Sequence, residues 1–319
     1  MTKRVVVTDY TFPDLHREEA AASAAAARFE PHQCKTAAEV ATAVRDASVV
    51  VVQFAPFDKS AVSAVAPGAT IIRYGVGYDN IDITAALSAG LKVGYIPDYC
   101  TDEVADHTAA LALSLLRKLP QLDRSVRQGH WAAVAYAKPL KPFSDIVFGF
   151  FGMGQIGRAV LTRLKPFGFR FIVSDPGLGP QDAANLGVTL TDADSLVRQA
   201  DVLALHAPSN AQTIGFFDTA RFAAMQPHAV MINSARGQLI VEEDLARALS
   251  EGEIGGAALD VFNAEPLPEN SPLRDAPNLI LTPHAAWYSD TAIDRLQHLV
   301  AEDIARALAG KPPRKPVMT

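Results

Sequence analysis

The segment that most constrains the fold is an apolar run followed at once by three spaced glycines. Residues 146–151 read Ile-Val-Phe-Gly-Phe-Phe, which is typical of a buried strand, and Gly152, Gly154 and Gly157 come directly after it. Helical sequence begins beyond them, so the glycines occupy a strand-to-helix turn. The first would permit a tight turn, the second a close approach of backbone to a ligand, and the third close helix packing. The spacing therefore predicts a phosphate-bearing ligand at the amino end of a helix.

A carboxylate after the next strand narrows the class of ligand further. Residues 171–173 are Phe-Ile-Val and predict a strand that ends at Ser174 and Asp175. An Asp there can accept hydrogen bonds from ribose hydroxyls and repels a 2′-phosphate, although an Asp before Pro176 could also simply cap a turn. We predict a Rossmann domain that binds NAD in preference to NADP. The predicted cofactor contacts in these two segments are Gly152, Gly154, Gln155, Ile156, Gly157 and Asp175.

Short β-branched runs alternate with helical patterns along the whole chain, which predicts parallel sheets covered by helices. In the first hundred residues we expect strands at 4–8, 48–53, 70–74 and 91–95, and an Ala-rich helix at 18–29. After a long helix at 101–118, strands are expected at 145–151, 170–174, 201–205, 229–232, 256–259 and 278–281, and a last helix at 289–309.

This element order predicts an α/β chain with two doubly wound parallel-sheet domains. A Rossmann NAD-binding domain at 101–287 would be inserted in a flavodoxin-like substrate domain made of residues 1–100 and 288–319. We do not expect a regulatory domain to follow.

Composition excludes several other classes of function. The formal net charge is −6 and no basic stripe is present, so we expect neither nucleic acid nor a membrane as a partner. The two cysteines, Cys34 and Cys100, cannot form a disulfide framework or a cysteine zinc site, and we expect no metal. No apolar stretch approaches ~20 residues and the amino-terminal one is too short for a secretory signal. We therefore expect a cytoplasmic location.

Charged side chains follow three of the predicted strands in the second series. Arg236 comes after strand 229–232, and His284 comes after strand 278–281. Asp260 and Glu265 both follow strand 256–259. Each alone could be a surface or capping residue. Because the carboxyl ends of strands border the ligand crevice of a doubly wound sheet, we expect these side chains to converge there.

The residue types in this set suit the reduction of a 2-oxo acid. A cation such as Arg236 can hold the carboxylate and polarise the carbonyl group. The imidazole of His284 can donate a proton near neutral pH, and the Glu265 carboxylate beside it would favour its protonated form. We therefore predict that Arg236, Glu265 and His284 are catalytic.

These segments resemble the D-isomer-specific 2-hydroxyacid dehydrogenase family over nearly the whole chain. The resemblance is carried by residues 73–82, 205–208 with Thr213, 233–245, 258–266 and 282–284. It implies the same catalytic set, substrate binding at Val76, Gly77 and Tyr78, and a contact of Asp260 with the carboxamide side of the nicotinamide. It also implies cofactor contacts at His206, Ala207, Pro208, Thr213, Ser234 and Ala235. His206 could instead be a turn residue, and Ser209–Asn210 departs from the usual Leu-Thr of the family's cofactor loop.

Residues 97–107 and 284–289 are more similar to the branch that contains the C-terminal binding proteins. This implies that Trp287 lines the substrate pocket, although it could instead anchor the last helix. His107 falls on the apolar stripe of the 101–118 helix, so we expect it to be buried and hydrogen-bonded. The same helix could bury a face in a homodimer, the usual state of the family.

The sequence therefore predicts an NAD-dependent oxidoreductase that interconverts a small 2-oxo acid and its D-2-hydroxy acid. The alternative is an NAD(H)-sensing binding protein related to the C-terminal binding proteins, which would use the same residues to shift a partner interface. The candidates for substrate selectivity are uncharged and partly aromatic, which favours an uncharged substituent on the acid: Gln53–Pro56, Tyr78, Tyr99 and Trp287.

Overall fold

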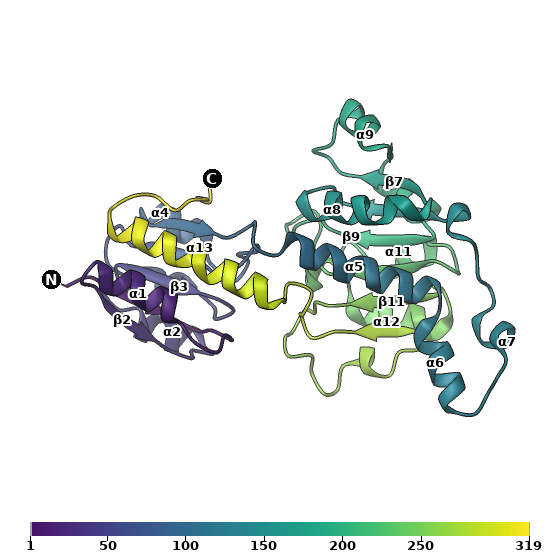
Figure 1. Ribbon diagram of the computed structural model, residues 1–319, viewed down its shortest axis with the longest axis horizontal. Coiled ribbons are helices and arrows are strands. Elements are labelled where there is room, and N and C mark those ends of the chain that lie inside the picture. Colours follow the sequence, from purple (N-terminus) through teal and green to yellow (C-terminus); the bar gives the residue numbers. More distant parts are fainter. Residues whose placement is uncertain (1, 319) are drawn as a thin grey trace. The chain divides into compact units, whose positions relative to one another are not determined.

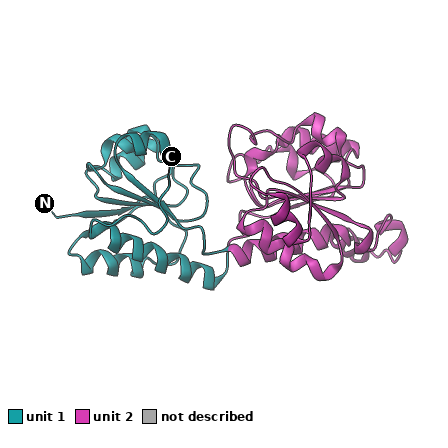
Figure 2. Cartoon of the chain, turned by 90° about the horizontal axis from the view of Figure 1, so that it is seen from above, with its two compact units in different colours: residues 1–100, 288–319 teal, residues 101–287 magenta. Residues whose placement is uncertain are grey.

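The computed structural model describes residues 2–318, which form two compact units (Figure 2). Unit 1 comprises the described residues up to Cys100 and from Tyr288 onward, and unit 2 comprises Thr101–Trp287. Each unit is a parallel sheet covered by helices, which confirms the predicted fold class. No helix within residues 2–318 is both long and apolar enough to cross a membrane.

Unit 1 is built on a five-stranded parallel sheet in the order β2-β1-β3-β4-β5. Its strands are β1 (Arg4–Val7), β2 (Arg28–Pro31), β3 (Val49–Val52), β4 (Thr70–Arg73) and β5 (Lys92–Tyr95). Its helices are α1 (His16–Ala24), α2 (Ala37–Ala43), α3 (Lys59–Ala64), α4 (Ile83–Ser88) and α13 (Asp290–Leu308), with α13 packed beside α1 (Figure 1). This strand order is that of flavodoxin-like sheets, as predicted.

The Ala-rich stretch that the sequence predicts as one helix over residues 18–29 is a helix followed by a strand. α1 ends at Ala24, Ala26 adopts a left-handed φ of 52°, and β2 begins at Arg28. β2 pairs in parallel with β1, with Arg4 opposite Arg28. The pairing overrides the helix propensity of the alanines, because propensity is weaker than tertiary contacts.

Unit 2 is built on a seven-stranded parallel sheet in the order β12-β11-β10-β9-β6-β7-β8. Its strands are β6 (Val147–Phe151), β7 (Arg170–Ser174), β8 (Thr189–Leu190), β9 (Val202–Leu205), β10 (Val230–Asn233), β11 (Gly256–Leu259) and β12 (Leu279–Leu281). Counted from β6, the order is the Rossmann order with one further strand at the edge. The short β8 is not among the predicted strands.

The helices of unit 2 cover both faces of this sheet. They are α5 (Thr101–Leu116), α6 (Leu119–Arg127), α7 (Ala133–Ala137), α8 (Gln155–Leu164), α9 (Pro180–Leu186), α10 (Ala193–Gln199), α11 (Thr219–Ala224) and α12 (Glu242–Glu251), with short 3₁₀ turns at Phe143–Asp145, Lys165–Phe167, Gly237–Leu239 and Pro272–Arg274. α5 and α8 pack side by side in one apolar cluster, and α10 to α12 share the other. The apolar side of α5 is therefore packed inside unit 2.

The strand order of unit 2 reverses between β6 and β9. β6 pairs with β7 on one side and with β9 on the other. Ligands bind doubly wound sheets at such a switch point, beyond the carboxyl ends of the strands. Residues 152–157 follow β6 and His206 follows β9, so both lie at this point.

Candidate active site

Gly152 and Gly157 allow the backbone after β6 to pack very closely. Gly152 has a φ of 97°, and a Cβ there would lie 2.7 Å from the nitrogen of Ala207. A Cβ on Gly157 would lie 3.0 Å from the carbonyl oxygen of Gly152. Any side chain at Gly152 would therefore displace the backbone that follows β9.

Gly154, by contrast, faces open space at the amino end of α8. Among residues 2–318, no heavy atom lies within 4 Å of the position its Cβ would take, apart from its chain neighbours. Gly154 is the N-cap and brings no side chain to the helix end. The first N–H groups of the helix, at Gln155 and Ile156 among others, have no intrahelical acceptor. An anion over Gly154 would receive those hydrogen bonds and a favourable helix dipole.

Asp175 ties the end of β7 to this glycine segment. Its Oδ2 accepts a hydrogen bond from the Met153 N–H at 2.6 Å, and its Oδ1 accepts one from the Gly177 N–H at 2.7 Å. The Arg158 Nε donates to the Met153 carbonyl at 3.2 Å, so the residue between the glycines is held from both sides. Asp175 is half-exposed and each oxygen keeps a second lone pair, so it can also accept ribose hydroxyls.

His206 places an imidazole beneath the glycine segment. Its ring stacks on Phe150 with centroids 6.0 Å apart, and its Cδ2 lies 3.7 Å from where a Gly157 Cβ would be. Its Nε2 is enclosed and has no hydrogen-bond partner among residues 2–318. Burial lowers the pKa of His206 to about 4, so the ring is neutral at pH 7. An enclosed nitrogen without a partner beside an open helix end fits a site that receives a phosphate-bearing ligand.

The chain beyond His206 closes into a turn. The Thr213 hydroxyl donates to the Pro208 carbonyl at 2.6 Å and accepts from the Asn210 N–H at 2.9 Å. Ala207 is buried against the glycine segment. Thr213 and Asn210 thus hold each other, and Asn210 has a structural use where the family usually carries Leu-Thr.

The loop after β10 carries Arg236 and is folded by Asn233. The Asn233 Oδ1 accepts from the Ala235 N–H at 3.0 Å, and its Nδ2 donates to the Arg236 carbonyl at 2.8 Å. Ser234 reaches α5, with its Oγ 2.7 Å from the Oγ1 of Thr108. Asn233 is fully buried, and sequence reasoning missed it as a loop anchor.

Asp260 organises the loop after β12. Its carboxylate is fully buried. Oδ1 accepts from the Thr282 hydroxyl at 2.5 Å and the Ala285 N–H at 2.9 Å, and Oδ2 accepts from the Ala286 N–H at 2.9 Å. The Asp260 carbonyl accepts from the His284 N–H at 2.8 Å, and His284 has a left-handed φ of 51°. Asp260 therefore fixes an uncommon backbone conformation at His284.

Glu265 and His284 form a hydrogen-bonded pair. His284 Nδ1 lies 2.7 Å from Glu265 Oε2, while Glu265 Oε1 accepts from the Phe262 N–H at 2.9 Å. Burial raises the pKa of Glu265, but the hydrogen bond and charge of His284 and the charge of Arg236 hold it below its ordinary value. The structure thus brings the three predicted catalytic residues of unit 2 together.

In unit 1, the loop after β4 offers backbone donors. Neither the Val76 nor the Gly77 amide has a hydrogen-bond acceptor within residues 2–318, and both residues are half-exposed. Tyr78 packs edge-to-face on Tyr95 with centroids 5.2 Å apart, so its ring belongs partly to the core of unit 1. Exposed successive amides form an anion-binding concavity.

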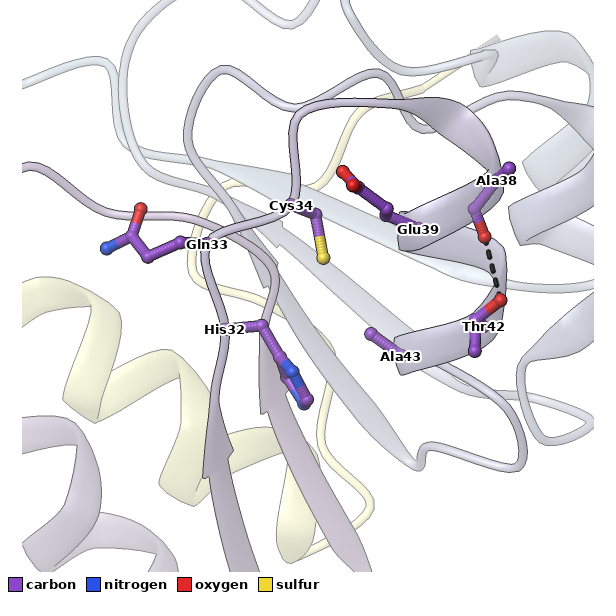
Figure 3. A pocket seen from close by; sticks show the side chains of 7 residues that line it. All are labelled: His32, Gln33, Cys34, Ala38, Glu39, Thr42 and Ala43. Carbon is purple, nitrogen blue, oxygen red and sulfur yellow. Dashed lines mark hydrogen bonds between the residues drawn. The ribbon is translucent and has the colours of Figure 1, made fainter.

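Two further observations bear on the predicted substrate contacts. Trp287 is half-buried and is the last residue of unit 2. A shallow hollow of about 490 Å³ on unit 1 is lined by none of the predicted site residues (Figure 3). Its lining comes from the segment after β2 and from α2, and Glu39 there caps α2 through the backbone of Lys35 and Thr36. This hollow is therefore separate from the strand-end residues.

Comparison with known proteins places the chain in a family. The sequence model described as "D-isomer specific 2-hydroxyacid dehydrogenase, NAD binding domain" matches residues 109–286. The chain therefore belongs to the D-isomer-specific 2-hydroxyacid dehydrogenase family and contains its NAD-binding domain. The comparisons do not distinguish the branch of the C-terminal binding proteins.

Among its relatives, the chain is 34% identical over 275 residues to D-3-phosphoglycerate dehydrogenase of Archaeoglobus fulgidus, covering 85% of this chain and 51% of the relative. It thus spans about half the length of the curated phosphoglycerate dehydrogenases it matches. It is 34% identical to glyoxylate reductase of Korarchaeum cryptofilum, covering 81% and 78% of the two chains. A solved structure of NADPH-dependent glyoxylate/hydroxypyruvate reductase from Sinorhizobium meliloti, with NADP and malonate, has a TM-score of 0.84 at 31% identity over 99% and 97% of the chains.

Proposed function

We propose that this protein is an NAD-dependent oxidoreductase that interconverts a small 2-oxo acid and its D-2-hydroxy acid. The observation that carries the proposal is the Glu265–His284 pair with Arg236 beside it, at the carboxyl ends of strands that also present an open dinucleotide site. The names of the relatives, which describe reductases and dehydrogenases of small acids, support the same substrate class.

Proton transfer is assigned to His284. Its Nδ1 is committed to Glu265, so Nε2 is the nitrogen that delivers a proton to the carbonyl oxygen of the acid. Glu265 stays ionised at neutral pH because its pKa lies below the ordinary value, and its hydrogen bond to Nδ1 holds the orientation of the imidazole. When bound, NADH supplies the hydride that reaches C2.

Substrate binding is assigned to one cation and two amides. Arg236 is positioned by Asn233 and polarises the carbonyl group, while the Val76 and Gly77 N–H groups receive the carboxylate. We keep Tyr78 and Trp287 as substrate contacts on the resemblance alone. For Asp260 we now favour a positioning role, since its oxygens already accept three hydrogen bonds within the loop.

The cofactor assignment is NAD(H), held by the glycine segment, Asp175 and the loops at 206–213 and 234–235. Asp175 would repel the 2′-phosphate of NADP. Substituting Asp175 by Ser should therefore raise kcat/KM with NADPH relative to NADH. An unchanged ratio would contradict the assignment of Asp175.

The decisive experiment follows absorbance at 340 nm with NADH and a panel of 2-oxo acids that includes glyoxylate, hydroxypyruvate and aryl pyruvates. We expect at least one acid to be reduced and its product to be the D isomer. If NADH binds and no acid is reduced, the proposed function is wrong. The alternative of an NAD(H)-sensing regulatory protein would then gain, although the relatives' names do not favour it.

We also propose a homodimer that forms through an arm at residues 119–140. Figure 1 shows α6 and α7 of this arm extending from the body of unit 2. It carries exposed large apolar side chains: Leu119, Val126, Trp131, Val134, Tyr136 and Leu140. Trp131 is 91% and Val134 is 76% exposed. Apolar patches of this kind on soluble proteins mark interaction sites, and a second copy of the chain would cover them.

Sedimentation of a variant with Trp131→Asp and Val134→Asp tests the dimer. We expect the wild type to sediment as a dimer and the variant as a monomer, while Leu190→Asp, an exposed apolar residue on β8, leaves the dimer intact. A monomeric wild type, or a variant that stays dimeric, would refute the proposal that the dimer forms through this arm. Cys34 and Cys100 form no disulfide within residues 2–318, which supports a reducing, cytoplasmic location that cell fractionation tests.

A further inference from the structure

Helix α5 supports two of the strand-end loops through two consecutive residues. The His107 Nε2 lies 3.1 Å from the Thr282 hydroxyl oxygen, in the loop that carries His284. Thr108 Oγ1 lies 2.7 Å from Ser234 Oγ, in the loop that carries Arg236. α5 is also packed against β10, which ends at the loop of Arg236, and against β11, which ends just before Asp260.

The hydrogen-bond directions around Thr282 follow from its single hydroxyl proton. That proton goes to Asp260 Oδ1 at 2.5 Å, because an ionised carboxylate can only accept. The Thr282 oxygen must then accept from His107, which requires a proton on the His107 Nε2. His107 Nε2 is also 3.6 Å from Asp260 Oδ1. The order of donation is therefore His107 to Thr282 to Asp260.

The series of hydrogen bonds from His107 through Thr282 ends on the Asp260 carboxylate, which shapes the loop of His284. The Asp260 carboxylate is fully buried, and a buried charge is costly unless donors surround it. Its other donors are the N–H groups of Ala285 and Ala286, the two residues after His284. A donor that fixes Thr282 against Asp260 thus restricts the backbone on both sides of His284.

We propose that His107 is a positioning residue for proton transfer, which holds the loop 282–286 in place through Thr282 and Asp260. His107 is partly buried, with 26% of its side chain exposed. The inference rests on the proposed function only for its effect on turnover. The effect on the loop itself is independent of what the protein catalyses.

The test compares His107→Leu, which removes the donor, with His107→Gln, which keeps an N–H at a similar reach. Thr282→Val and the double variant complete a double-mutant cycle. His298→Leu, an exposed histidine on α13, is the matched control. The readouts are kcat, KM for the acid, NADH affinity, and amide hydrogen exchange of residues 282–286.

We expect His107→Leu to lower kcat by about ten- to a hundredfold, since small misplacements of a reacting group cost this much. KM and NADH affinity should change by less than about threefold. His107→Gln should restore kcat to within about threefold of the wild type. Exchange of residues 282–286 should be several-fold faster in His107→Leu alone. The double variant should be no slower than Thr282→Val, because both changes break one chain of contacts.

Three results would overturn the proposal: a wild-type kcat and wild-type exchange in His107→Leu, equal damage from Gln and Leu, or multiplied effects in the double variant. If His107→Leu does not fold, the other two variants still test the proposal, because Thr282→Val should lower kcat and His107→Gln should not. Faster loop exchange in a protein that reduces no acid would refute the proposed function and keep the positioning role. A loss of turnover in His284→Ala with no effect of His107→Leu would keep the proposed function and refute the positioning role of His107.

Discussion

Both units contain a buried aspartate that follows a strand and holds a neighbouring loop. In unit 1, Asp9 follows β1 and accepts from the Thr8 hydroxyl and from the N–H groups of Gln53, Phe54 and Ala55, at 2.5 to 3.0 Å. In unit 2, Asp260 follows β11 and holds the loop of His284 in the same manner. A buried aspartate that accepts hydrogen bonds from a neighbouring loop thus occurs in both sheets, although their strand orders differ.

The strand-end loops of the two units differ in the groups that they offer to a ligand. Around the loops of unit 1 the exposed donors are backbone amides, at Val76 and Gly77, whereas the loops of unit 2 present the charged side chains of Arg236, Glu265 and His284. Amides can bind an anion but do not act as general acids near neutral pH, whereas imidazole does. In the proposed assignment the proton donor belongs to unit 2, whereas unit 1 contributes only groups that bind the anion, and substitutions can test this difference.

The largest effect should come from His284→Ala in unit 2. Loss of the proton donor should lower kcat by about 10²–10⁴, the usual contribution of a general acid. Steady-state reduction at 340 nm measures this, with His298→Ala on α13 as the control. A variant with wild-type turnover would remove His284 from the chemistry.

Glu265→Gln should have the next largest effect. A hydrogen bond to a charged group contributes roughly 1.5–3 kcal/mol, so kcat at neutral pH should fall by about ten- to a hundredfold. In the wild type the pKa of Glu265 is lowered, so its carboxylate stays charged as the pH falls from 7 to 5.

The advantage of the wild type over Glu265→Gln in kcat/KM should therefore persist from pH 7 to pH 5 and shrink only at lower pH, where Glu265 takes up a proton; a pH profile of kcat/KM detects this. An identical profile in the variant and the wild type would show that the Glu265 charge does not support proton donation.

In unit 1, Asp9→Ala should affect binding more than chemistry. It leaves three backbone N–H groups of the 53–55 loop without their acceptor, at about 1–3 kcal/mol each when buried. If this loop helps to select the acid, KM should rise by about tenfold while kcat changes by less than about threefold. A drop in kcat with unchanged KM would erase the division between the units.

The smallest effect concerns the stability of unit 1 through Glu18. Burial raises the pKa of Glu18, despite the hydrogen bond from the Tyr74 hydroxyl at 2.8 Å. Its contribution to stability is therefore full below the ordinary carboxyl pKa and is lost as the pH rises through the folded-state value. Glu18→Gln should remove this loss, so its advantage over the wild type should be larger at pH 8 than at pH 5, by about 1 kcal/mol or less.

Urea unfolding at pH 5 and pH 8, with hydrogen exchange of α1 as the probe of unit 1, measures this difference in stability. Glu30→Gln is a control of opposite sign, because the Arg4 hydrogen bond lowers the pKa of Glu30. That variant should lose stability relative to the wild type at pH 8. The prediction for Glu18 fails if both variants respond to pH alike.

The sequence was informative wherever a short segment carries its own constraint. The glycine spacing at 152–157 predicts a strand, turn and helix, and the structure contains β6, the turn and α8 there. Strands 170–174 and 256–259 were predicted to the residue, because each is a short, mainly apolar segment that ends directly before an aspartate. The Ala-rich stretch failed because the pairing of β2 with β1 depends on residues far away in the chain.

The sequence by itself determined which residues stand at the strand ends, and so the chemistry available: Arg236, Glu265 and His284 beside a dinucleotide-binding turn. Only the tertiary structure decided how they are held. Asn233, Asp260 and Thr282 are ordinary polar residues in a list of letters, and His107 looks like one more residue on a helix stripe. Their roles depend on hydrogen bonds of 2.5 to 3.1 Å, the longest of which joins His107 to Thr282, 175 positions away. The bonds of Asn233 stay within its own loop, but those that join His107, Thr282 and Asp260 need a folded sheet to bring distant segments together, and no local pattern encodes them.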